Sequence, residues 1–184
     1  MKLSTRLSRR LAAGVGLASA AILLPTAALA SSAVAGAPSG PAVPACISTH
    51  TRVWYGVPGD AATGHIRFQL QFSNIGHSTC SFFGYPGVSA LDIHGHQVGL
   101  PASHSGTRLT VTLAPGSTAH VVLEVTQAAF VCAHPVKTSV LRVFPPGQTH
   151  AQLVEFPSGG CPGRSLLHVD ALHPGAGIPG FSGS

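Results

Sequence analysis

Residues 65 to 72 read His-Ile-Arg-Phe-Gln-Leu-Gln-Phe, a strict alternation of polar and apolar side chains. A period of two is that of a β-strand, in which successive side chains point to opposite faces. Ile66, Phe68, Leu70 and Phe72 therefore share one face, and the polar side chains share the other. The stretch predicts a strand with one face in a hydrophobic core and the other face in water.

The same alternation occurs on both sides of a single turn. Residues 108–113 read Arg-Leu-Thr-Val-Thr-Leu, and Ala119, Val121, Leu123 and Val125 repeat the pattern after the turn formers at 114–117. Two alternating runs joined by a short Pro/Gly turn are typical of a hairpin. We predict that these two stretches pair with each other.

Further short β-rich runs extend the pattern over the rest of the chain. They lie at 47–54, 79–83, 87–93, 97–100, 138–144, 150–156 and 165–171. The 22 Gly and 15 Pro residues occur too frequently along the chain to allow long helices. Many short strands separated by turns predict an all-β fold, an antiparallel immunoglobulin-like β-sandwich, with a barrel as the alternative.

Residues 1–30 have the three parts of a signal peptide. Four basic residues within the first ten precede an apolar stretch at 11–24, which leads to the small-residue cleavage site Ala28-Leu29-Ala30. A transmembrane anchor is the alternative, but the stretch is shorter than the roughly 20 residues that span a bilayer. We expect export and cleavage after Ala30, giving a secreted, extracellular protein without a membrane span, which is either released or held at the cell wall by non-covalent contacts.

Removal of the leader changes the charge of the chain. Four of the ten Lys and Arg residues lie in the leader, so six basic residues remain against five acids and the net charge falls from +5 to +1. Nucleic-acid binding needs clustered basic residues, and no cluster remains. The composition predicts a linker at 31–45, one monomeric sandwich domain at 46–172 and a disordered Gly/Pro tail at 173–184.

Four cysteines remain after export: Cys46, Cys80, Cys132 and Cys161. An even count in an oxidising compartment predicts two disulfides, whereas a zinc site needs close Cys-x-x-Cys pairs that are absent. Four cysteines allow three pairings. We favour Cys46 with Cys80 and Cys132 with Cys161, because each pair closes a loop of about 30 to 35 residues, worth roughly 3 to 4 kcal/mol.

Four segments in order resemble a known family. They are Phe-Ser-Asn-Ile-Gly at 72–76, Phe-Gly-Tyr-Pro-Gly-Val at 83–88, Leu-Ala-Pro-Gly-Ser-Thr-Ala at 113–119 and Val-Phe-Pro-Pro-Gly-Gln at 143–148. Together with the layout of the cysteines, they resemble the actinobacterial exported proteins described as domain of unknown function 4232, over about residues 46–169. The resemblance implies a secreted or envelope-associated β-sandwich, and it implies no reaction. One departure is that histidines flank Gly95.

That departure supplies one candidate metal site. His94 and His96 form a His-x-His pair beside Asp92, and alternate residues of a hairpin can present two imidazoles to one metal ion. The competing interpretation is an ordinary polar hairpin tip in a chain with 11 histidines. We keep Asp92, His94 and His96 as a speculative metal site, and we expect no other cofactor.

Catalytic chemistry has little support in the sequence. No Gly-x-Ser-x-Gly is present, His104 and the serines beside it would point to opposite faces of a strand, and only five acids could supply paired carboxylates. We therefore predict no catalytic residues. Trp54, Tyr55 and Tyr85 are candidate binding residues, although Tyr85-Pro86-Gly87 is also the composition of a structural turn.

These observations predict a non-catalytic, envelope-associated binding module whose partner is an extracellular protein or a cell-wall component. A secreted metal-binding protein that uses the histidine hairpin is the alternative. A hydrolase, whose residues would meet only in the fold, is the third possibility.

Overall fold

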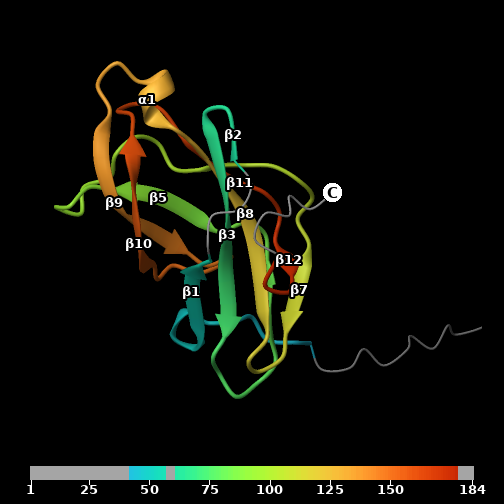
Figure 1. Cartoon of the computed structure of the whole chain (residues 1–184). Helices are drawn as coiled ribbons and strands as arrows, with labels where there is room; N and C mark the ends of the chain where they lie inside the picture. The colour runs from blue at the N-terminus through green and yellow to red at the C-terminus, as the bar shows by residue number, and fades with distance from the viewer. Residues whose placement is uncertain (1–41, 57–60, 178–184) are drawn as a thin grey trace, which may run out of the picture. The chain divides into compact units, whose positions relative to one another are not determined.

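A computed structural model describes residues 42–56 and 61–177. The predicted signal peptide, and the linker up to residue 41, lie outside the described residues. The regular elements of the described chain are β-strands, apart from one short 3-10 helix and one short α-helix (Figure 1). The elements are η1 (Ser48–His50), β1 (Thr51–Tyr55), β2 (Ala61–Ala62), β3 (His65–Asn74), β4 (Cys80–Phe83), β5 (Gly87–Leu91), β6 (Ser103–His104), β7 (Thr110–Leu113), β8 (Thr118–Thr126), α1 (Ala128–Val131), β9 (Val136–Phe144), β10 (Gln152–Gly160), β11 (Leu167–Val169) and β12 (His173–Pro174).

The strands form three sheets. The largest has seven strands in the order β1-β3-β8-β11-β6, with β2 beside β3 and β12 beside β8. A second sheet has the order β10-β9-β5, and β4 pairs with β7 in a third. All strand pairs are antiparallel except β11 with β6. The predicted all-β, antiparallel fold class is confirmed.

The alternating stretches at 65–72 and 119–125 are the central pair of the large sheet. Strands β3 and β8 run antiparallel with Phe68 opposite Leu123, Leu70 opposite Val121 and Phe72 opposite Ala119. These apolar side chains are buried on one face. Burial of each large side chain contributes about 1.5 to 3 kcal/mol, which fixes the register, since a slip of one residue would move the whole set into water.

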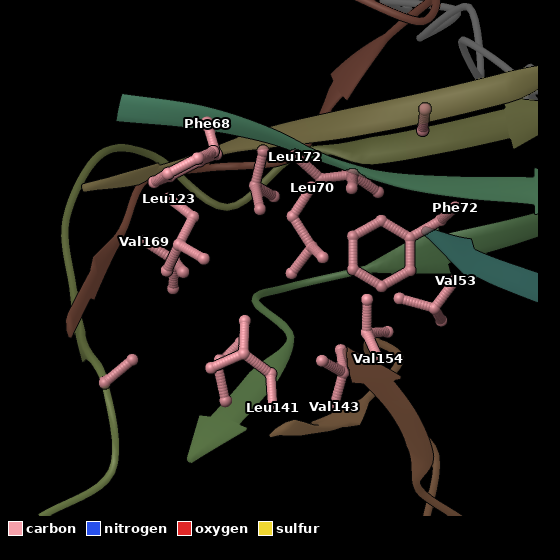
Figure 2. Close-up of a cluster of buried hydrophobic side chains, with 14 of the residues drawn as sticks. Val53, Phe68, Leu70, Phe72, Leu123, Leu141, Val143, Val154, Val169 and Leu172 are labelled. Carbon is pink, nitrogen blue, oxygen red and sulfur yellow. The ribbon is translucent and has the colours of Figure 1, made fainter. Parts of the chain in front are cut away.

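The core lies between the large sheet and the smaller ones. Figure 2 shows side chains of β3 and β8 facing Leu141, Val143 and Val154, which come from β9 and β10. Phe82 of β4 closes the core beside Phe72, with ring centroids 6.0 Å apart. Near the other end of β3, Phe68 and Phe156 meet edge to face at 4.7 Å, and Tyr55 packs against both rings.

Two disulfides join Cys46 to Cys80 and Cys132 to Cys161. The favoured pairing is therefore confirmed. The first disulfide ties the segment before η1 to β4, and the second ties the end of α1 to the end of β10.

The predicted hairpin between 108–113 and 119–125 is wrong. Strand β7 pairs with β4, whereas β8 pairs with β3, β11 and β12. Both strands are amphipathic as expected, but the turn at 114–117 carries the chain from one sheet to another. Each strand buries its apolar face equally well in either arrangement, so the alternation could not identify the partner.

The structure also differs from the sequence at two shorter segments. Residues 97–100 form no regular strand: Gly99 has φ +77°, and a side chain there would meet the carbonyl oxygens of Arg164 and Cys161. The expected tail begins later than residue 173, because His173 and Pro174 pair with His120 and Ala119 as β12. Residues 178–184 of that tail lie outside the described residues.

Candidate functional site

The main candidate surface is the outer face of the seven-stranded sheet, the face turned away from the core. Cross-strand pairing places polar and aromatic side chains in rows across this face. The rows are Arg52, Ser73 and Thr118; Trp54, Gln71, His120 and His173; and Arg67, Glu124, His168 and Ser103. The outer face therefore collects residues from six segments of the chain.

A chain of hydrogen bonds links Trp54 of the second row to Ser73 and Thr118 of the first row. The indole Nε1 of Trp54 donates to Ser73 Oγ at 3.0 Å, and Ser73 Oγ lies 2.8 Å from Thr118 Oγ1. Trp54 remains 38% exposed. Together with Arg52, Ser73 and Ile75, it lines an open depression of about 480 Å³, which we call the Trp54 depression.

A cluster of titratable groups lies further along the outer face. His120 Nδ1 donates to the carbonyl of Gly175 at 2.8 Å, and its ring stacks on His173 with centroids 5.6 Å apart. His173 Nε2 lies 3.5 Å from Asp170 Oδ2. Burial raises the pKa of Asp170 above its ordinary value of 3.8, against the opposing effect of the backbone N–H of Val122, which donates to Oδ1 at 2.6 Å.

The third row brings serine and histidine side chains together. His168 Nδ1 lies 2.9 Å from Ser103 Oγ, and Nε2 lies 2.8 Å from Ser105 Oγ. A neutral imidazole has one N–H, so His168 donates to one serine and accepts from the other. Beside it, Glu124 forms an ion pair with Arg67 at 2.9 Å, and its second carboxylate oxygen lies 3.3 Å from His65 Nδ1.

The sequence-predicted metal residues lie on the loop after β5, away from the outer face. Asp92 Oδ1 accepts the backbone N–H groups of His94 and His96 at 2.8 and 2.9 Å, and the two imidazole centroids are 6.2 Å apart. These hydrogen bonds lower the pKa of Asp92 below its ordinary value of 3.8, and the bond from the His96 N–H has the larger effect. Among the described residues, no three His, Cys, Asp or Glu side chains are grouped to hold a metal ion. The metal site stays a prediction.

The predicted aromatic binding residues do not form one surface. Tyr55 follows Trp54 but faces the core, where it packs against Phe68 and Phe156. Tyr85 lies on a separate loop and donates its hydroxyl hydrogen to the carbonyl of Gly106. Its ring stacks on His104 at 4.9 Å, and the Arg108 guanidinium lies 5.4 Å from its centroid. Of the three residues, only Trp54 lies on the outer face.

The depressions elsewhere suit a ligand less well. A cavity between β5, β9 and β10 holds about 10 Å³, enough for roughly one water molecule, and the buried Thr138 hydroxyl on its wall has no other partner. A groove of about 430 Å³ beside the Cys46–Cys80 disulfide is lined by Pro44, Ile47, His50 and His77, among others. The groove contains no ion pair among the described residues.

Several of these contacts join residues that no sequence motif connects. His168 and Ser105 are 63 positions apart, and His120 and Gly175 are 55 apart. The alternation assigned the polar side chains of 65–72 to a solvent face, which is wrong for Gln69 and Gln71, because both are buried on the outer face and Gly177 lies against Gln69. It carried no information about which strands lie beside them, so the rows could not be predicted.

The fold and the surface define a disulfide-bonded, all-β domain whose large sheet has a polar outer face, exposed at Arg52 and Trp54 and closed at Gln69 and Gln71. No described helix is long and apolar enough to cross a bilayer. A profile of the family described as "Domain of unknown function (DUF4232)" matches residues 46–173, and the chain belongs to this family. No curated protein and no solved structure matches the chain.

Proposed function

We propose that this domain is an exported, non-catalytic binding module of the cell envelope, and that the outer face of the seven-stranded sheet contacts its partner. The partner is an extracellular protein or a cell-wall component. The observation that carries the proposal is the cross-strand fixing of outer-face side chains, Trp54 to Ser73 to Thr118 and Arg67 to Glu124. Side chains already held in place lose little conformational entropy on binding.

Two further features support the proposal. The two disulfides suit an oxidising compartment outside the cytoplasm. The enclosed cavity of about 10 Å³ is far smaller than the several hundred Å³ typical of small-molecule sites, and the two larger hollows, of about 430 and 480 Å³, are an open groove and an open depression, so recognition on a surface fits this architecture better than a reaction in a pocket.

Site-specific cross-linking on intact cells tests the proposal. A photo-reactive residue would replace Arg67 on the outer face, or Glu155, an exposed residue of β10 on the opposite side of the domain. We expect reproducible adducts from position 67 and few from position 155. Adducts only from position 155, or none from either position, would contradict an outer-face binding role.

A hydrolase is the second candidate, because Ser105 Oγ lies 2.8 Å from His168 Nε2, the contact that activates a serine nucleophile. In Ser-His-Asp sites a carboxylate orients the second ring nitrogen. Here the hydroxyl of Ser103 meets that nitrogen instead. We expect a fluorophosphonate probe to leave the protein unlabelled, whereas labelling that Ser105→Ala abolishes and Ser103→Ala retains would favour the hydrolase.

A further inference from the structure

The Trp54 depression combines an aromatic wall with a nearby cation. Arg52 and Trp54 are two residues apart on β1, so both side chains project from the same face of the sheet. Ser73 and Ile75, which is 56% exposed, line the depression as well. An open depression of this kind covers one face of a ligand and leaves the other face in solvent.

The indole ring is held in one orientation before any ligand arrives. Its only polar hydrogen is used by Ser73, and Ser73 is held in turn by Thr118 of β8. The ring therefore keeps a fixed face towards the depression. The negative face of an aromatic ring attracts the weakly positive C–H groups along one side of a sugar ring.

The guanidinium of Arg52 is unusual among the cations of this face. Arg67 is neutralised by Glu124 at 2.9 Å, whereas the Arg52 side chain has no ion pair or hydrogen bond among the described residues. A guanidinium has five N–H donors in a planar fork that matches a carboxylate. Arg52 thus offers an uncompensated positive charge on the same strand as the indole, two residues before Trp54.

The edge of β1 is closed to a peptide strand. Gln152 of β10 accepts the Val53 N–H at 3.0 Å and donates to the Thr51 carbonyl at 2.5 Å. A peptide that binds by strand addition needs these backbone groups. The depression therefore favours a ligand recognised by its ring face and its charge over one recognised by its main chain.

We propose that the Trp54 depression binds an acidic glycan, with one sugar ring stacked on Trp54 and the sugar carboxylate paired with Arg52. This inference rests on the proposed function, because it names the ligand of the same outer face. It assigns stacking to Trp54, charge recognition to Arg52 and orientation of the indole to Ser73.

Intrinsic fluorescence gives a direct test, since Trp54 is the single tryptophan of the chain. The protein would be titrated with trigalacturonic acid and with neutral galactotriose. We expect the acidic sugar to shift the Trp54 emission at saturation, and we expect the neutral sugar to bind about tenfold or more weakly. Arg52→Gln should weaken the acidic sugar by a similar factor and leave the neutral sugar unchanged.

Lys137→Gln is the matched control, because it removes one positive charge from an exposed residue at the start of β9. It should change neither titration. Trp54→Phe, followed by calorimetry and checked for folding by circular dichroism, should retain weakened binding. No emission change with either sugar, or acidic-sugar binding that Arg52→Gln leaves intact, would overturn the inference. If either of these two results were found and position 67 still formed adducts with a protein, the glycan would be rejected as the ligand. The proposed role as a binding module would be retained.

Discussion

Gln152 hydrogen-bonds the backbone of Val53 across 99 positions of sequence, and its amide replaces the strand that the edge of β1 lacks. Its Oε1 accepts the Val53 N–H at 3.0 Å, and its Nε2 donates to the carbonyls of Thr51 and Ser48 at 2.5 and 3.2 Å. Unpaired edge strands invite pairing with other chains. One side chain therefore both anchors β1 and protects its edge.

Replacement of Gln152 with Ala should lower the free energy of unfolding by about 1 to 3 kcal/mol, because the buried backbone groups of β1 lose their partner. Urea denaturation measures this change, and light scattering should show increased self-association through the freed edge. Gln127→Ala is the control, since that side chain makes no capping hydrogen bond at α1. Equal stability of the two variants would show that the Gln152 amide is dispensable.

Asp170 should make the domain less stable as the pH rises. Its folded-state pKa is raised, so its carboxyl group favours folding below the ordinary pKa of 3.8, and this contribution is lost as the pH rises through the raised value. Asp170→Asn keeps an oxygen for the Val122 N–H and removes the titration. The melting temperature of this variant minus that of the parent should therefore increase as the pH rises above 3.8. A constant difference between the two melting curves across that range would contradict the assignment.

Asp92 should have the opposite effect. Its folded-state pKa is lowered by the His96 and His94 backbone N–H groups, so its contribution is present above pH 3.8 and is lost as the pH falls below that value. Asp92→Asn retains an acceptor for both groups but cannot titrate. Its stability should thus fall less on acidification than that of the parent protein. Circular dichroism melts between neutral pH and the acid range check this, with Asp170→Asn as the variant of opposite sign.

Removal of the Cys132–Cys161 disulfide by replacing both residues with Ala should cost about 3 kcal/mol, the chain-entropy value for a loop of this length. The pair spans 29 positions and holds α1 against the end of β10. Hydrogen exchange should rise first at residues 128–136 and 160–164, before the β3–β8 pair is affected. Uniform loss of protection would show that this disulfide stabilises the whole domain rather than its α1 end.

The sequence was informative about faces and much less about neighbours. Alternation at 65–72 correctly placed Phe68, Leu70 and Phe72 in the core, but it wrongly placed Gln69 and Gln71 in water, because a period of two separates the two faces of a strand and does not say what covers the second one. It failed for β7, which pairs with β4 and not with β8. The favoured disulfide pairing, chosen for its loops of about 30 to 35 residues, is the one observed, although the sequence alone left all three pairings open.

The candidate site was predictable only in part. Trp54 was singled out from the sequence, but Arg52 and Ser73 acquire meaning only through the register of β1 against β3. His168, Ser103 and Ser105 were missed, because β6 and β11 are short and pair in parallel, which no local pattern indicates. Non-local contacts of this kind depend on the whole topology.

The Gln148 and Gln152 amides also set an order of events for a chain that emerges N-terminus first. Gln148 bonds Cys46 and Ser48, and Gln152 bonds Ser48, Thr51 and Val53, at separations of 99 to 104 positions. The first strand to emerge therefore cannot be locked until the segment after β9 has followed it. If the Cys46–Cys80 disulfide forms before the last third of the domain arrives, it therefore forms without the hydrogen bonds of these two amides.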